Sequence, residues 1–301
     1  MITQPKKLLI SSLVAAALFL TVSAPAQAHS LWVTLFESHT HEPGHVISSI
    51  GWGHTPPLDD LLTSPNGSAS IEDYYVMAPD GKKIPLGVPT TESSIEKTDP
   101  YTHIANGDLG VRKIEILEQS PEGTYQVVAK NKEGFFTRYL NKKGKMRMAP
   151  KPIDQLKDVK EVLESVKFTM IGKSFYTVGK WSSPKKLGTE LEIIPTCDLS
   201  TVHPGDIITF DVFFMGKPVT TDSNAINYMT LTSDTFGGPD GFFLSSYIMN
   251  GKAQFRIPTN GHWVANVYIA QDVDKNASLA KFAKQCSKVF SGATVSFTTN
   301  P

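Results

Sequence analysis

The sequence has no excess of charge of either sign. Its 301 residues include 29 Lys and Arg and 29 Asp and Glu, so the formal net charge is zero. Proteins that bind nucleic acid carry a basic stripe that neutralises phosphates, and no such stripe is present. Nucleic acid is therefore not expected as a partner.

Cysteine is scarce. Cys197 and Cys286 are the only two, and neither lies in a CxxC pair or beside a histidine, which argues against a thiolate metal site. In an exported protein two cysteines are expected to pair. A Cys197–Cys286 disulfide would close a loop of about 90 residues and stabilise the fold by roughly 4 kcal/mol on the loop-entropy model.

Signatures of hydrolases are missing as well. The chain has no GxSxG elbow and no phosphate-binding loop. Neither cysteine has the glycine-rich or histidine-adjacent surroundings of a nucleophile. We therefore expect a protein that is not an enzyme and has no catalytic residues.

Long apolar runs are confined to the start of the chain. Lys6-Lys7 precede an apolar run from Leu8 to Val22, and Ala26-Gln27-Ala28 is a small-residue cleavage site. These are the three parts of a signal peptide over residues 1–28. No later run approaches the roughly 20 residues that cross a bilayer. The sequence predicts a periplasmic protein, cleaved after Ala28, with no transmembrane segment in its mature form.

Histidine is concentrated where the mature chain would begin. Cleavage after Ala28 would free the amine of His29, and this amine and the imidazole of the same residue can chelate one metal ion. Histidine is the commonest protein ligand for transition metals. We expect a divalent transition metal, and the histidines alone fit nickel, cobalt, copper or zinc. The candidate ligands are His29, His54, His39, His41, His45 and His103.

His54 lies in the segment Gly51-Trp52-Gly53-His54-Thr55-Pro56-Pro57. The glycines and prolines predict a stiff loop directly after a strand, and strand pairing could bring this imidazole beside His29. The Asp59-Asp60 pair offers a carboxylate as a ligand or as a partner that orients a ligating histidine. The alternative is a histidine hydrogen-bonded within its own loop.

The segment His41-Glu42-Pro43-Gly44-His45 matches the HExxH pattern of zinc proteases, and we reject the match. That chemistry requires both histidines on one face of a helix, whereas Pro43-Gly44 predicts a turn. The histidines of this segment, with His39, are helpers of the metal site or part of a polar surface loop. The other histidines are expected in a loop (His103), in a turn (His203) and at the start of a strand (His262).

Segments rich in Val, Ile, Phe, Tyr and Thr recur between Gly, Pro and Asn from His29 onward, the pattern of a mostly antiparallel β protein. The expected strands of the first half are 31–36, 45–50, 71–78, 111–117 and 124–130, with a hairpin at Asp80-Gly81. Those of the second half are 191–195, 207–214, 225–232, 251–257, 263–269 and 293–298. The latter set indicates an immunoglobulin-like sandwich.

Between the two sets the pattern changes. Apolar residues from Ile153 to Val166 are spaced three and four apart, which predicts an amphipathic helix, and the basic run 141–147 before it is expected to be a solvated loop. The predicted fold class is mostly β, with two β-sandwich domains joined by a short helical connector. The predicted segments are a signal peptide (1–28), an N-terminal β domain with a His-rich loop (29–140), the helical connector (141–187) and a C-terminal immunoglobulin-like sandwich (188–301).

Several short motifs together resemble the DUF4198 family. They are Ala28-His29-x-x-Trp32 directly after the signal peptide, Gly53-His54-x-x-Pro57, the middle helix, His203-Pro204-Gly205-Asp206 and Gly216-Lys217-Pro218. The family includes proteins described as periplasmic components of cobalt or nickel uptake systems. The resemblance implies a periplasmic β protein associated with transition-metal uptake, with His29 and His54 at the motif positions connected with metal.

Three functions fit these features. The first is a periplasmic nickel- or cobalt-binding protein that delivers the ion to the membrane components of an importer. The second is a copper oxidase in which the amine and imidazole of His29 and the imidazole of His54 surround an open position, although the sequence has no clear row of aromatics for a polymeric substrate. The third is a structural or protein-binding β-sandwich module without metal.

Overall fold

The computed structural model describes residues 29–40, 43–64, 68–221, 226–236 and 242–299. The fold is mostly β, as the sequence predicts. Its helical segments in this part of the chain are the 3₁₀ turns η1 (Ile153–Gln155), η2 (Leu199–Thr201) and η4 (Ala277–Phe282). None of the described helical segments has the length and hydropathy of a membrane span. The predicted signal peptide, residues 1–28, lies outside the described residues.

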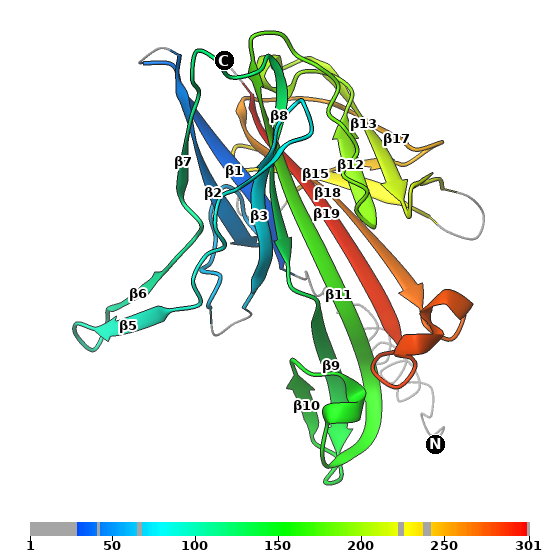
Figure 1. The fold of residues 1–301 in the computed structure, drawn as a ribbon. Coiled ribbons are helices and arrows are strands. Elements are labelled where there is room, and N and C mark those ends of the chain that lie inside the picture. The colour runs from blue at the N-terminus through cyan, green and yellow to red at the C-terminus, as the bar shows by residue number, and fades with distance from the viewer. Residues whose placement is uncertain (1–28, 41–42, 65–67, 222–225, 237–241, 300–301) are drawn as a thin grey trace, which may run out of the picture.

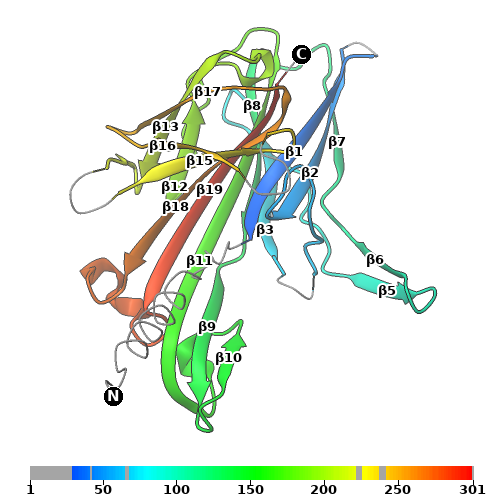
Figure 2. The same ribbon diagram turned by 180° about the vertical axis from the view of Figure 1, so that it is seen from behind.

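A ten-stranded sheet, the central sheet, runs through the molecule (Figures 1 and 2). Its main path is β16 (Leu244–Tyr247), β15 (Tyr228–Ser233), β18 (Gly261–Asp272), β19 (Lys288–Thr299), β11 (Val159–Val178), β8 (Gly123–Asn131), β3 (Ile71–Met77) and β4 (Lys83–Pro85). Two further strands, β9 (Gly134–Asn141) and β10 (Met146–Ala149), extend it beside the first half of β11. The long strand β11 therefore forms the middle of the sheet, parallel to β19.

Smaller sheets complete the fold. The β1 sheet contains β1 (Ser30–Ser38), β2 (His45–Gly53) and β7 (Arg112–Glu115). The β13 sheet contains β12 (Leu191–Pro195), β13 (Ile207–Phe214), β14 (Lys217–Pro218) and β17 (Lys252–Arg256). Strands β5 (Ser93–Lys97) and β6 (His103–Gly107) form a separate hairpin that projects from the body (Figure 1).

The central sheet separates two hydrophobic cores. Successive side chains of a strand point to opposite faces, and β11 shows this alternation. Ile171 and Phe175 belong to the core under the β13 sheet, whereas Met170 and Tyr176 belong to the core under the β1 sheet. The arrangement is thus a three-layered β structure in which one sheet supplies a face to each core.

Strand β1 is held against the central sheet by polar contacts as well as apolar ones. The hydroxyl of Thr294 donates to the carbonyl of Leu31 (2.6 Å), and the hydroxyl of Ser296 donates to the carbonyl of Val33. Both carbonyls would otherwise be unpaired on an edge strand. The backbone of Trp32 passes so close to Gly172 that a Cβ there would lie 2.8 Å from its Cα. A glycine is therefore required where β1 crosses β11.

Most of the predicted strands are confirmed. The segments 191–195 and 207–214 coincide with β12 and β13, and the hairpin at Asp80-Gly81 joins β3 to β4. The strand predicted at 225–232 is β15, which begins at Tyr228, and Ala225 lies outside the described residues. Strands from both predicted domains share the central sheet, and the division into two domains stays a prediction.

The predicted helical connector is wrong. Within 141–187 only η1 is helical, and β11 fills residues 159–178. The register of β11 against β9 is irregular after Val159 and again after Val162. A bulge inserts an extra residue and shifts the alternation of the strand. The half-buried Val159 and Val162 are therefore three apart, which imitates the spacing of a helix.

The predicted disulfide is also wrong, because Cys197 and Cys286 are both free. The residue after Cys197 accepts a hydrogen bond from the hydroxyl of Thr177 near one end of β11 (3.3 Å). The residue after Cys286 donates its backbone N–H to the carbonyl of Ser165, which lies 12 residues before Thr177 in the same strand (2.9 Å). Along β11 these two points are about 40 Å apart, whereas a disulfide needs Cα atoms within about 7 Å.

The crossing of β1 over β11 gives a prediction about stability. We expect Gly172→Ala to lower the free energy of unfolding by about 1–3 kcal/mol, because the added methyl group meets backbone atoms that cannot move aside. Urea unfolding of both proteins measures the difference. Gly107→Ala is the matched control, since its Cβ would first meet a side-chain atom, Thr63 Oγ1, at 3.2 Å. If Gly172→Ala and the wild type were equally stable, the close approach of the Trp32 backbone to Gly172 would be contradicted.

Candidate metal site

The β1–β2 hairpin brings His29 and His54 together. Ser30 pairs with Gly53 in the antiparallel register, so the residue before β1 and the residue after β2 lie opposite each other at the open end of the hairpin. The two imidazole rings have centroids 4.5 Å apart and are tilted by 45°. The structure therefore places the two principal candidates of the sequence side by side.

The loop after His54 is held in place by an aspartate. Asp59 accepts hydrogen bonds through Oδ2 from the backbone N–H groups of His54 (2.6 Å) and Thr55 (3.3 Å). Gly53 has a φ of +132°, and a Cβ on it would lie 2.3 Å from the same carboxylate. This φ and the close carboxylate both require glycine in the Gly-His motif.

The other end of the loop is tied to β1. The peptide bond Pro56-Pro57 is cis, and the carbonyl of Pro57 accepts from Trp32 Nε1 (2.8 Å) and from the hydroxyl of Thr34 (3.1 Å). The loop that carries His54 is thus fastened to the strand that follows His29. A stiff connection of this kind keeps both imidazoles in place at little further entropic cost.

Trp52 completes the surroundings of His29. Its ring stacks on the His29 imidazole, with centroids 5.2 Å apart and an interplanar angle of 16°. Burial lowers the pKa of His29, the neighbouring His54 lowers it further, and the carboxylates of Asp60 and Asp59 oppose the shift. A lowered pKa favours the neutral imidazole, which is the form that binds a metal. Sequence reasoning missed the stacking of Trp52, although the residue lies within the motif.

The carboxylates lie near the histidines without forming a finished metal centre. Asp59 Oδ2 is 3.7 Å from His54 Nδ1, and Asp60 Oδ1 accepts the backbone N–H of Leu61 (2.8 Å). In the described part of the chain, no three or more His, Cys, Asp or Glu side chains are grouped so that they could hold a metal ion. The geometry supplies a pair of imidazoles, and further ligands would have to join them.

The remaining candidate ligands lie elsewhere. His39 and His45 are at the closed end of the β1–β2 hairpin, about 27 Å from the open end, and His39 has a 70% exposed side chain 3.6 Å from Glu37. His41 lies outside the described residues. His103 begins β6, on the projecting hairpin. Since His45 begins a strand, the rejection of the HExxH pattern is confirmed.

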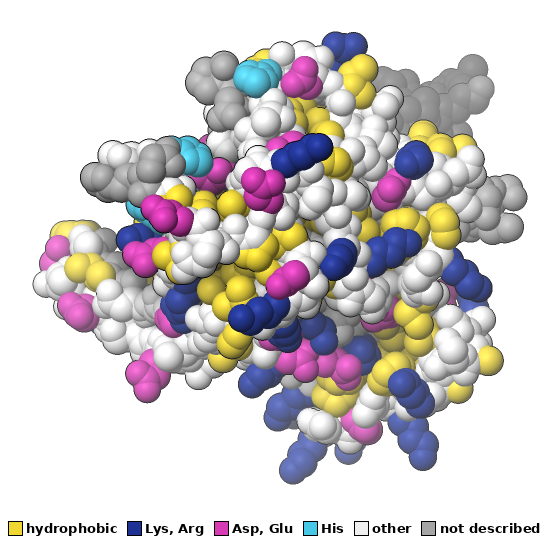
Figure 3. Space-filling model, turned by 45° about the horizontal axis from the view of Figure 1, so that its top comes forward, with side chains coloured by type: hydrophobic (Ala, Val, Ile, Leu, Met, Phe, Trp, Pro, Cys, Tyr) yellow, Lys and Arg dark blue, Asp and Glu magenta, His cyan; other side chains and the backbone are white. Residues whose placement is uncertain are grey.

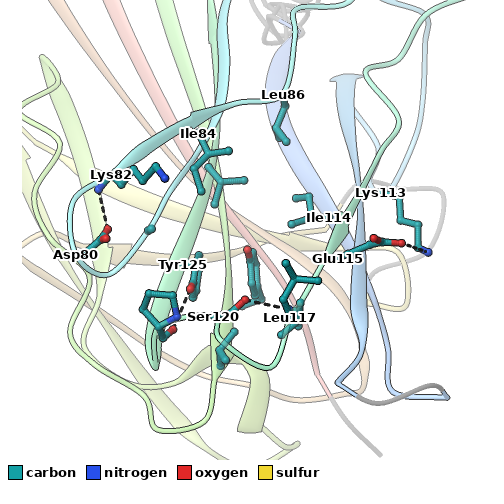
Figure 4. Close-up of a pocket in the computed structure, with 16 residues that line it drawn as sticks. Asp80, Lys82, Ile84, Leu86, Lys113, Ile114, Glu115, Leu117, Ser120 and Tyr125 are labelled. Atoms are coloured by element: carbon teal, nitrogen blue, oxygen red, sulfur yellow. Dashed lines mark hydrogen bonds and ion pairs between the residues drawn. The ribbon is translucent and has the colours of Figure 1, made fainter.

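A separate hollow of about 400 Å³ lies between β3–β4 and β7 (Figure 4). Its walls are mainly apolar. The two acidic residues of its lining, Asp80 and Glu115, are on opposite sides (Figure 4), and Glu115 is paired with Lys113 at 2.8 Å. The lining contains no histidine or cysteine. It therefore does not compete with the histidine pair as a metal site.

Comparison with known proteins agrees with the resemblance seen in the motifs. A model of the DUF4198 family, described as a domain of unknown function, matches residues 26–271. The matched range includes the histidine pair, β11 and most of the central sheet. A search among curated proteins finds no match.

The pairing of the histidines can be tested without metal. We expect the imidazole of His29 to stay neutral to a pH below 6.5, its ordinary pKa, and His54→Gln to raise that pKa because a nearby positive charge is removed. Histidine resonances followed by NMR across pH measure both values. His103→Gln, on the projecting hairpin, is the control. A His29 titration that is the same in both variants would show that the two rings do not interact.

Proposed function

We propose that this chain, which belongs to the DUF4198 family, binds a nickel or cobalt ion at His29 and His54 and delivers it to a membrane uptake system from the periplasm. The observation that carries the proposal is the pair of imidazoles, 4.5 Å apart, at the open end of the β1–β2 hairpin. The resemblance to proteins of cobalt and nickel uptake supports the choice of ion.

The distance between the rings suits a shared ion. Ligating nitrogens lie about 2.0–2.1 Å from a metal such as zinc, and two of them are then about 3 Å from each other. To meet this requirement His54, whose side chain is 37% exposed, would turn one ring nitrogen toward the ion. Asp59, beside His54, would complete the coordination or orient the imidazole, as carboxylates commonly do around ligating histidines.

A third ligand would come from the backbone. In the 301-residue chain the nitrogen of His29 belongs to the peptide bond with Ala28, and cleavage there would make it an amine with a pKa near 8. Metal binding near neutral pH would then displace a proton at modest cost. Amine and imidazole nitrogens also bind Cu(II), generally more tightly than nickel or cobalt, so affinity alone does not identify the ion.

Calorimetry of the chain that begins at His29 tests the site. We expect Ni(II) or Co(II) to bind with a Kd below about 10 µM, and His29→Ala or His54→Ala to weaken binding at least about tenfold, or 1.4 kcal/mol, since each removes a ligand. His203→Ala and His103→Ala should bind as the wild type does. Tight binding that neither His29→Ala nor His54→Ala weakens would place the ion elsewhere and end the proposal.

The free amine has a test of its own. A chain that begins at His29 with its terminal amine acetylated retains every side chain of the site and loses only the amine as a ligand. We expect its affinity for Ni(II) to fall at least about tenfold relative to the same chain with a free amine. Equal affinities would exclude the amine as a ligand.

A separate assay tests the alternative function, a copper oxidase built on the same two histidines. Peroxide production by the copper-loaded protein in the presence of a reductant would favour that function over metal delivery.

A further inference from the structure

The β9–β10 hairpin forms one end of the molecule (Figures 1 and 2), and cations are gathered there. Six exposed side chains define what we term the basic end: Lys142, Lys143, Lys145, Arg147, Lys157 and Lys160. Over residues 142–161 cations outnumber anions seven to three, although the whole chain has no net charge. Figure 3 shows Lys and Arg side chains along the lower edge of the face in view.

Described residues do not neutralise the cations of the basic end through ion pairs. None of the six forms an ion pair with a described residue, whereas Arg138, farther from the tip, pairs with Glu164 at 3.4 Å. The acidic residues nearest in the chain, Asp158 and Glu161, are exposed and likewise have no described ion-pair partner. The field at this end therefore extends into solvent over about a Debye length, near 10 Å at 0.1 M salt.

The tip is an ordered turn. Asn141 accepts through Oδ1 from the backbone N–H groups of Lys143 (3.1 Å) and Lys145 (2.9 Å), and its carbonyl accepts from Gly144 (2.8 Å). The backbone N–H of Lys142 donates to the carbonyl of Asp158 (3.0 Å), which fastens the hairpin to the segment before β11. These bonds hold the lysines together without using their side chains.

Exposed apolar side chains lie on β10 and on the neighbouring part of β11. Met146 is 60% exposed, Met148 is 65% exposed and Leu163 is 43% exposed. Met146 and Met148 are two apart in β10 and share one face of the ribbon, on which Leu140 lies opposite Met146. Flexible thioether side chains adapt to irregular apolar surroundings. Because successive residues of a strand face opposite ways, Arg147 lies on the other face of the ribbon from these two methionines.

We infer that the basic end docks the protein on the surface of an anionic lipid bilayer, a role that does not depend on metal binding. Clustered Lys and Arg are attracted to anionic headgroups by about 1 kcal/mol each. The hairpin ends the molecule (Figures 1 and 2), so its tip can meet a planar surface. It offers neither the groove nor the exposed aromatics that single-stranded nucleic acid would require.

Vesicle flotation tests the docking. We expect the chain that begins at His29 to float with vesicles that contain phosphatidylglycerol, and not with vesicles of phosphatidylcholine alone, and to be released as salt rises toward 1 M. Neutralising three lysines together, Lys142→Gln, Lys143→Gln and Lys145→Gln, should weaken binding about 100-fold, or about fivefold per lysine. The side chains of these lysines form no hydrogen bond or ion pair with a described residue, so the thermal unfolding of the variant should be unchanged.

A matched control removes the same charge elsewhere. Lys180→Gln, Lys185→Gln and Lys217→Gln change three exposed lysines outside the basic end and should leave flotation as in the wild type. The inference is overturned if both triple variants lose binding equally, if neither vesicle binds the protein, or if duplex DNA or polyglutamate binds the basic end more tightly than the anionic vesicles do.

Discussion

The contact between β1 and the central sheet positions the candidate site. The edge carbonyls of Leu31 and Val33 are satisfied by hydroxyl groups of β19, and the absence of a side chain at Gly172 lets the β1 backbone approach β11. Once β1 is fixed, the antiparallel register fixes β2 and the residue that follows it. A site built from the two free ends of one hairpin is therefore only as rigid as the docking of that hairpin.

The sequence predicted the fold best where one face of a strand is buried. The predicted bounds of β12 and β13 match the structure, because composition and alternation reveal the apolar positions of a strand with a buried face. β5 and β6 were missed because all of their residues are exposed. β11 was misassigned because its bulges change the spacing of Val159 and Val162. In both failures the local pattern lacked the usual alternation, because no face of β5 or β6 is buried and because β11 is bulged against β9.

The candidate site was partly predictable for a related reason. Pro43-Gly44 indicated a turn between two strands, and a hairpin that turns there brings the residues near its two outer ends together, whatever its exact register. A turn at Pro43-Gly44 therefore pairs His29 with His54 and sets His39 and His45 apart. The stacking of Trp52 on His29 and the hydrogen bond from the backbone of His54 to Asp59 were not predictable, since both depend on how a loop rich in proline and glycine folds back on itself.

A carrier must hold an ion and also release it, and the histidine pair differs in exposure in a way that bears on both tasks. His29 is half-buried against Trp52 at the start of a docked strand, whereas His54 lies in an exposed loop. In the proposed carrier, an acceptor approaching from the exposed side would therefore meet His54 before His29. A closed structural site leaves no position for an incoming ligand, so a site that exposes one of its two imidazoles would suit delivery better than storage.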